Sequence, residues 1–236
     1  MKNDKKTSDL LFVFVIFSSW ILISRFTPYL NRVIDFRKIH PWILPAVRMT
    51  LMFLVTYFYV RFYEKKSFSE GFNFSFRRIA RNVLWAFVFA LIDSAVIMGY
   101  LFLIVKPLTQ EVITASSAVS QPVPPPFWSR LLEYIYIVYE GIIEVFIFIG
   151  FLFDRLWKRW NWPLALIVAN VGFGLWHFNY WSKGLLEGSL MIILTFISGI
   201  IHSLNYMKTK NSLSPTICHF LTDSPSAVRI LLGVMH

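Results

Sequence analysis

Long apolar runs separated by short basic segments dominate the hydrophobic pattern of the chain. Because a helix needs about 20 apolar residues to cross the hydrocarbon core, each run indicates a membrane span. Seven runs are found, and they cover Leu10–Ile23, Ile43–Val60, Val83–Val105, about Leu131–Phe153, Trp162 to about Phe178, Leu185 to about Leu204, and a less apolar stretch from Leu213 onward. An eighth span would follow if Ala227–Val234 crossed separately. The pattern predicts an all-α, polytopic integral membrane helix bundle with about seven to eight transmembrane helices.

The composition strengthens the membrane assignment. Apolar residues make up 56% of the 236 positions and aromatic residues 18%, whereas only 15% are charged. Soluble domains carry about 25% charged residues, so soluble, disordered and collagen-like classes are excluded. A single cysteine, Cys218, can form no internal disulfide and no cysteine-based zinc framework.

The basic residues predict how the chain is oriented in the membrane. With a cytoplasmic N-terminus, the inside segments hold fourteen Lys and Arg residues and the outside segments seven. The positive-inside rule therefore favours an N-terminus in the cytoplasm. The net charge of +10 lies in clusters between apolar runs, so it indicates membrane orientation, and no nucleic-acid partner is expected. The first run follows three lysines but lacks a small-x-small cleavage site, which favours an uncleaved helix.

A proline-rich stretch divides the chain. The sequence ASSAVSQPVPPP at Ala115–Pro126 has low hydrophobicity and a proline cluster that cannot continue a helix, so a loop is expected there. We therefore expect an N-terminal membrane-spanning region at residues 1–121, with about three helices, and a second domain at residues 122–236. The second domain holds nearly all of the candidate chemistry.

Polar residues inside the predicted spans mark where function should lie. An ionisable group at bilayer depth costs roughly 2.5 to 3.5 kcal/mol on insertion scales, so it needs a partner or a role. Three pairs with i, i+4 spacing lie on three different back-half spans: Glu140 and Glu144, Phe173 and His177, and His219 and Asp223. Each pair shares one helix face. In the front half, Asp93 and Arg48 are expected to pair with each other or to face the cavity. In the back half, His202 is expected to be structural or solvated.

Two kinds of chemistry are open to these groups. A carboxylate in a partly dry site can take a proton from water, and a histidine can stabilise the oxyanion that forms from a peptide carbonyl. Glu144, His177 and His219 also make a possible His2Glu set for a divalent metal such as zinc, around an open water position. The spacing does not decide between them, and there is no HExxH motif or cysteine pair.

Depth along the helices predicts which carboxylate meets the histidine. Arg130 is expected to mark the outer membrane boundary and Trp162 the inner one. At 1.5 Å per residue, Glu144 then lies about 21 Å from the outer boundary and His177 about 22 Å from the inner one. In a core of about 30 Å these depths fall on opposite sides of the midplane. Glu140, about 15 Å deep, is therefore expected to meet His177 more easily.

The order of these motifs resembles the CPBP intramembrane proteases, also called the Abi or CAAX-protease family. Its leading motif, EExxxR followed by an apolar run, is matched by EVFIFIG at Glu144–Gly150, and its FxxxH motif by FGLWH at Phe173–His177. Its HxxxN/D motif is matched by HFLTD at His219–Asp223, after a loop and Ser-Pro in NSLSPTICH. The resemblance covers roughly Pro126–Ser224.

The resemblance implies roles for individual residues. Glu144 corresponds to the carboxylate assigned to water activation, His177 to the oxyanion donor, and His219 with Asp223 to the pair that completes the site. Val145 and Ile149 stand where the family has its second Glu and its Arg. Glu140, one turn earlier on the same face, is the expected replacement for the second carboxylate.

The expected function is therefore that of an intramembrane endopeptidase. The resemblance implies a membrane-associated protein or peptide substrate, which includes prenylated CAAX-like proteins, and it favours a bacterial cell membrane. The alternative is a catalytically silent family member that acts as a membrane immunity or scaffold protein, consistent with Val145 and Ile149. A proton or cation transporter also fits intramembrane glutamates, but no internal repeat or pair of broken helices supports one.

Overall fold

The computed structural model describes residues 18, 20, 22, 43–109, 126–177 and 184–232, with side chains as far as 224. The predicted first span and the predicted proline-rich loop lie almost entirely outside the described residues. Within the described ranges the chain is helical and holds no β-strand. The bundle consists of α-helices and π-helical segments, written η, with these bounds: α3 Ile43–Phe58, η1 Tyr59–Tyr63, α4 Phe68–Gly71, α5 Ile79–Tyr100, η2 Leu101–Val105, α7 Phe127–Glu144, η3 Val145–Phe153, α8 Asp154–Arg159, α9 Trp162–Trp176, α10 Leu185–Thr209 and α11 Leu213–Leu232.

The structure confirms a helical membrane bundle but changes the expected spans. Among the described residues, four continuous helices are long and apolar enough to cross a membrane, at Ile43–Tyr63, Ile79–Thr109, Phe127–Arg159 and Leu185–Thr209. α9 is apolar but has only 15 residues, about 22 Å of helix. α11 runs unbroken to Leu232, so a separate eighth span that begins at Ala227 is wrong. The expected count of seven to eight spans is thus not reached within the described residues.

Local signals explain how α8 and α9 form a hairpin. α8 ends at Arg159, and Trp160 turns into extended backbone with a φ of −109° and a ψ of 179°. The Asn161 side chain then caps α9 by accepting a hydrogen bond from the Leu164 N–H, and proline occupies the first turn. Asparagine at the cap and proline in the first turn are favoured at a helix start. The hairpin sets the relative depth of α7 and α9.

The core surrounds η3, because the segment that follows Glu144 is buried along its whole length. The Phe146 ring packs against four phenylalanine rings from α3, α4 and the following loop, with ring centroids 5.2–6.4 Å apart. On another side of η3, Phe148 contacts Trp20 and Phe173, each with ring centroids 5.3 Å apart. Aromatic packing therefore holds the helix that carries Glu144 at the centre of the bundle.

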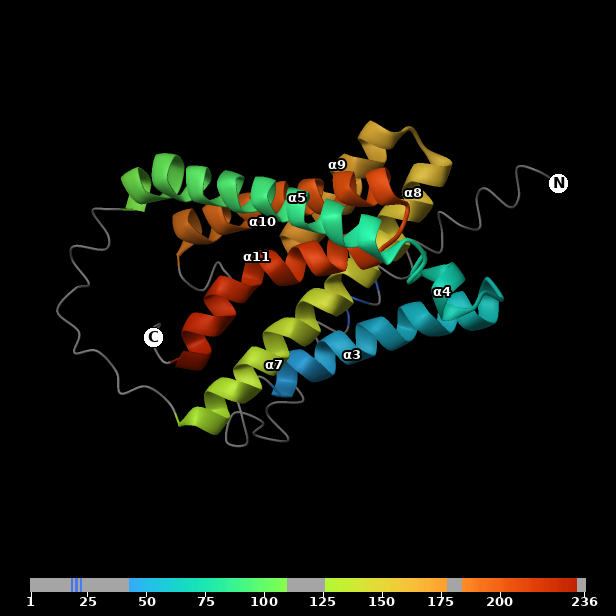
Figure 1. Cartoon of the computed structure of the whole chain (residues 1–236), viewed down its shortest axis with the longest axis horizontal. Helices are drawn as coiled ribbons and strands as arrows, with labels where there is room; N and C mark the ends of the chain where they lie inside the picture. The colour runs from blue at the N-terminus through green and yellow to red at the C-terminus, as the bar shows by residue number, and fades with distance from the viewer. Residues whose placement is uncertain are drawn as a thin grey trace.

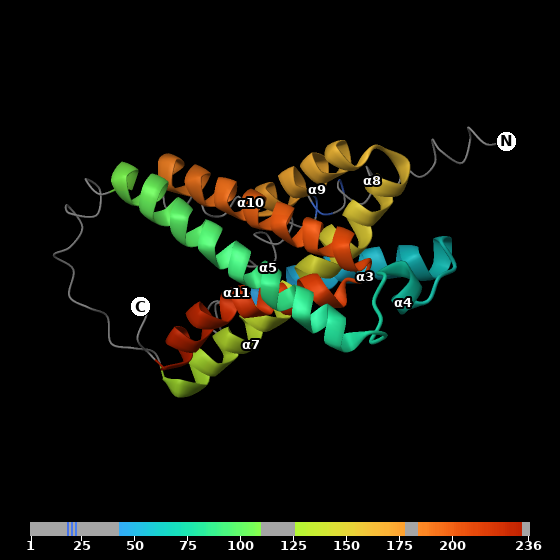
Figure 2. The ribbon, with the colours of Figure 1, turned by 45° about the horizontal axis from the view of Figure 1, so that its top comes forward.

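The remaining helices cover this central helix. In Figure 1, α11 crosses the middle of the bundle between α5 and α7, and it packs against both. α10 packs on α5 and α9, and Figure 2 shows α5 and α10 side by side on the face opposite α7. α7 packs on α11, and its continuation η3 packs on α9. The three predicted motifs lie on α7, α9 and α11.

An ion pair fixes one end of the central helix. The Arg155 guanidinium donates from Nε and Nη2 to both carboxylate oxygens of Glu64, at 2.8 and 2.7 Å. Burial alone would raise the pKa of Glu64, but hydrogen bonds and charge from Arg155 and Lys66 outweigh it and hold that pKa below its usual 4.5. The segment after η1 is therefore tied to α8 by a charged, bidentate contact.

Candidate functional site

Glu144 is at the centre of a polar cluster inside the bundle. It is the last residue of α7, and only 3% of its surface is exposed. Its Oε1 accepts a hydrogen bond from Trp176 Nε1 at 3.0 Å and lies 3.5 Å from His177 Nε2. Its Oε2 lies 4.0 Å from His219 Nε2. One buried carboxylate thus faces side chains from both α9 and α11.

His177 lies at the C-terminal end of α9, where it caps the helix. Its Nδ1 is 3.0 Å from the Phe173 carbonyl oxygen. Because a carbonyl oxygen can only accept, this contact assigns a proton to Nδ1 and turns Nε2 toward Glu144. The Phe173 ring packs edge-on against the imidazole, with centroids 5.1 Å apart. The spacing of the FxxxH motif therefore supplies both a hydrogen bond and a packing partner that orient the histidine.

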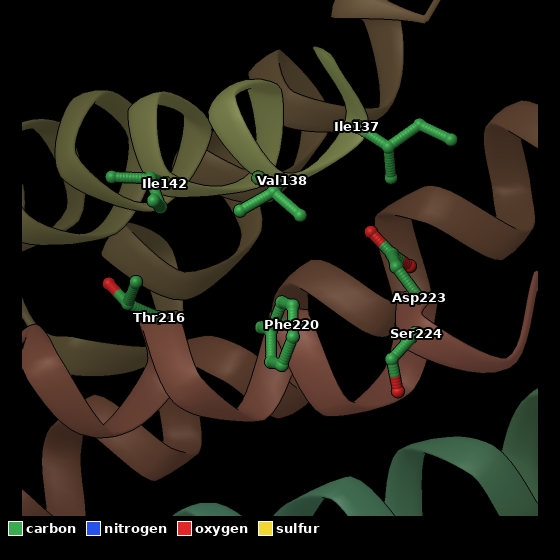
Figure 3. A pocket seen from close by; sticks show the side chains of 8 residues that line it. Ile137, Val138, Ile142, Thr216, Phe220, Asp223 and Ser224 are labelled. Atoms are coloured by element: carbon green, nitrogen blue, oxygen red, sulfur yellow. The ribbon is translucent and has the colours of Figure 1, made fainter. Parts of the chain in front are cut away.

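His219 is held on α11 by Asp223, one turn further on. Its Nε2 lies 3.0 Å from Asp223 Oδ2. Gly141 of α7 faces the imidazole, since a Cβ at that position would meet the ring at 3.6–3.7 Å. Figure 3 shows a pocket between α7 and α11 in which Asp223 lies opposite Ile137. The Asp223 side chain is 40% exposed, so this pair connects the buried cluster to the pocket.

Glu140 lies close to Glu144 but has different partners. Its Oε1 accepts a hydrogen bond from the Tyr136 hydroxyl at 2.7 Å. The expectation that Glu140 meets His177 more easily is wrong, because Glu144 is the carboxylate at ion-pair distance from that ring. The depth estimate placed a membrane boundary at Arg130, but α7, η3 and α8 form one helix of 33 residues. At about 50 Å this helix is longer than the hydrocarbon core.

Two front-half residues also reach the cluster, although not as a pair. The Arg48 guanidinium of α3 stacks on the Trp176 ring, 4.4 Å from its centroid, and its charge interacts with those of Glu140 and Glu144. Asp93 of α5 instead accepts a hydrogen bond from the Ser198 hydroxyl at 2.9 Å. Arg48 thus supplies positive charge near the two glutamates.

His202 of α10, which was expected to be structural or solvated, is buried beside the site. It is 1% exposed, and its ring stacks on His219 with centroids 4.9 Å apart. Its Nε2 lies 3.6 Å from Asp93 Oδ2. The available signal was the i, i+4 spacing of Ser198 and His202, whose polar atoms lie 3.4 Å apart. No spacing within one helix indicates that Asp93 of α5 lies next to His202.

The metal alternative is not supported by this arrangement. Glu144, His177 and His219 are neighbours, but within the described ranges no group of three or more His, Cys, Asp or Glu side chains could hold a metal ion. The steps below therefore use only the carboxylate and imidazole groups of the chain.

Residues 126–224 match the family model for type II CAAX prenyl endopeptidase Rce1-like proteins. This match agrees with the resemblance of the same segment to the CPBP/CAAX proteases. The match contains Glu144, His177, His219 and Asp223, and it agrees with an endopeptidase of the intramembrane kind in an integral membrane protein. No curated protein and no solved structure matches the chain.

The matched segment departs from the leading motif of that family at two buried positions. Val145 is 1% exposed and Ile149 2%, and both belong to the apolar core. Neither position has room for a solvated charge. The charges next to Glu144 come instead from Glu140, one turn earlier, and from Arg48 on a different helix.

Proposed function

We propose that residues 126–224 form a CAAX protease domain that hydrolyses a peptide bond within the membrane, with Glu144 as the base that activates water. The observation that carries this proposal is the position of Glu144, a buried carboxylate 3.5 Å from His177 and 4.0 Å from His219. A general base must lie within reach of its proton donor and acceptor. A carboxylate used only for helix association would not require two histidines from two other helices.

The geometry supports a balanced proton route. Glu144 takes a proton from water while the resulting hydroxide attacks the peptide carbonyl carbon, so that a C–O bond forms and an oxyanion develops. The proton passes from Glu144 to His177 Nε2, and the imidazolium donates a hydrogen bond from Nε2–H to the oxyanion. His177 then transfers that proton to the leaving amine nitrogen. Collapse of the intermediate breaks the C–N bond, and the proton leaves with the amine. His219, fixed by Asp223, supplies a second donor that faces Glu144.

The substrate class follows from the family and from the membrane setting. Proteins or peptides associated with the membrane, including prenylated CAAX-like termini, would bring a scissile bond to this depth. The pocket between α7 and α11 adjoins the site, because Asp223 lines it and also holds His219.

A catalytically silent scaffold or immunity protein is the second candidate. The observation in its favour is that Val145 and Ile149 replace two motif charges with buried apolar side chains. In that case Glu144 would have no chemical role. The two candidates differ in what Glu144→Gln does, because this substitution keeps the shape of the side chain and removes the base.

The deciding experiment compares wild-type protein, Glu144→Gln and His177→Ala in the native host. Protein termini in the membrane and secreted fractions are measured by mass spectrometry. We expect cleavage products that are present with wild type and lost in both variants, while membrane insertion is unchanged.

Glu187→Gln is the matched control, since Glu187 is a half-buried glutamate in the first turn of α10. It should leave every cleavage product in place. Full proteolysis by Glu144→Gln would disprove the assignment of the base. If wild type and Glu144→Gln gave identical termini and the same phenotype, the scaffold candidate would be supported instead.

A further inference from the structure

A basic pocket lies at one end of the bundle, away from the glutamate and histidine cluster. Its cavity volume is about 440 Å³. Its walls come from the loop before α5, the first turns of α5, and the turn between α10 and α11. The lining residues are Ser69, Asn73, Phe74, Ser75, Arg77, Arg78, Arg81, Asn82, Thr209, Lys210 and Asn211.

The lining is strongly positive. Three arginines and one lysine face this cavity, and none of its lining residues is an aspartate or glutamate. Arg77, Arg78 and Arg81 are exposed. Asparagine amides and serine and threonine hydroxyls complete the walls and add neutral hydrogen-bond donors. This combination suits a compact anion, because guanidinium groups present several N–H donors to phosphate oxygens.

Hydrogen bonds hold the walls of the pocket together. Asn211 accepts from the Ser75 N–H at 3.1 Å and donates to the Ser75 carbonyl oxygen at 2.6 Å. The buried Asn82 side chain donates to the Arg77 carbonyl oxygen at 3.1 Å. Ser212 donates to the Phe72 carbonyl oxygen at 2.6 Å. The basic loop is therefore fixed to the α10–α11 turn, and the cavity exists without a ligand.

Several residues that line this pocket have strained backbone conformations. Among the residues that the structure describes, four that are not glycine have positive φ angles. Three of them, Asn73, Arg78 and Lys210, line this pocket, with φ of 51°, 57° and 54°. Such conformations are unfavourable for L residues and are kept where surrounding structure demands them, often at ligand sites.

The pocket also lies at the edge of the membrane-spanning region. One candidate span ends at Tyr63, the next begins at Ile79, and a third ends at Thr209. The apolar side chains of Phe76 and Leu84 are 66% and 61% exposed next to the basic residues. A phospholipid would fit this layout, with its phosphate in the pocket and its acyl chains along α5.

We propose that this pocket binds a phosphate group, carried by the headgroup of an anionic lipid. Basic pockets between membrane helices on the cytoplasmic side are suited to such headgroups. The positive-inside rule predicts that this end is cytoplasmic. The proposal is independent of peptide hydrolysis, because no pocket residue belongs to the site around Glu144.

The test uses the full-length protein in neutral detergent. Native mass spectrometry measures the apparent affinity for dioleoyl phosphatidylglycerol, with dioleoyl phosphatidylcholine for comparison. Each basic group near an anionic lipid raises the binding affinity by a factor of about five. The double variant Arg77→Gln with Arg81→Gln should therefore weaken phosphatidylglycerol binding about thirtyfold. Arg61→Gln with Lys65→Gln is the matched control, since it removes two exposed charges outside the pocket lining.

A second arm separates a lipid from free phosphate. Thermal unfolding is followed with inorganic phosphate alone, and Glu144→Gln serves as a binding-competent reference in both arms. Phosphate stabilisation that is lost only in the pocket variant, without preference for phosphatidylglycerol, would support the site and identify free phosphate as its ligand. The proposal is overturned if the pocket variant binds both probes like wild type, or if the control variant loses as much affinity as the pocket variant.

Discussion

At the residue scale, the Glu144 carboxylate can be buried in an apolar bundle because neighbouring side chains offset the cost of removing it from water. Trp176 donates one hydrogen bond to Glu144, and the Arg48 guanidinium stacks on the same indole ring. An uncompensated charge at this depth would be costly. Trp176 therefore positions the carboxylate, and it does so through a single N–H group.

Trp176→Phe tests that positioning role. The variant keeps an aromatic ring for Arg48 but loses the 3.0 Å hydrogen bond to Glu144. A hydrogen bond to a charged group contributes about 1.5 kcal/mol or more, so kcat should fall about tenfold while KM changes little. Steady-state cleavage of a substrate found in the terminus comparison gives both constants. Trp128→Phe, at an exposed position on α7, should match wild type, and equal rates for both variants would contradict the role.

At the element scale, the α8–α9 hairpin explains why Glu144 and His177 meet. Glu144 lies 15 residues before Arg159, and His177 lies 15 residues after Trp162. Both side chains are therefore about 22 Å from the same turn. Counting from the turn predicts the contact, whereas counting from separate membrane boundaries placed the two residues on opposite sides of the midplane.

Close packing of α9 on α10 depends on Gly199. A Cβ there would lie 2.5 Å from Asn170 Oδ1 and 2.7 Å from Phe173 Cδ1. Gly199→Ala must therefore displace Phe173, which packs against His177. We expect a loss of about 1 to 3 kcal/mol in stability, together with reduced cleavage. Gly99→Ala is the control, because nothing lies within 4 Å of its added Cβ, and thermal unfolding in detergent should show it unchanged or slightly stabilised.

The Glu64–Arg155 contact predicts a pH dependence at one end of the central helix. Since the folded-state pKa of Glu64 lies below its usual 4.5, the ionised carboxylate stabilises the fold above pH 4.5. This contribution is lost as the pH falls through the folded-state pKa. Glu64→Gln should be about 1 to 3 kcal/mol less stable than wild type at pH 7, and the difference should shrink below pH 4.5. If the stability difference between wild type and Glu64→Gln were the same at pH 7 and below pH 4.5, this prediction would be wrong.

Sequence patterns predicted contacts within a helix well and contacts between helices poorly. The i, i+4 spacing predicted that His219 and Asp223 share a helix face. In the structure, His219 Nε2 and Asp223 Oδ2 lie 3.0 Å apart. The contact between Asp93 and Ser198 joins residues 105 positions apart, and no periodicity within one helix encodes it. The neighbours of His202 lie on α5 and α11, so the pattern of α10 alone did not indicate that it lies beside the site.

At the scale of the whole molecule, the front half of the chain takes part in the site. α3 brings Arg48 to the Trp176 ring, and Thr50 of the same helix lies 2.7 Å from the Tyr139 hydroxyl on α7. α5 brings Asp93 to Ser198, beside His202. The predicted boundary between residues 1–121 and 122–236 therefore separates groups that contact one another.

This sharing predicts how the two regions behave when they are expressed apart. Residues 122–236 alone contain Glu144, His177 and His219 but lack Arg48 and Asp93, so the glutamates lose a compensating charge. We expect this fragment to insert without cleaving substrate, and co-expression with residues 1–121 to restore cleavage. Substrate termini and co-purification of the two fragments are measured together. Restoration should fail when residues 1–121 carry Arg48→Ala and persist when they carry Arg61→Ala, an exposed arginine further along the same span. Full activity of residues 122–236 on their own would show that the front half only anchors the protein, because the charge of Arg48 would then be dispensable next to Glu140 and Glu144.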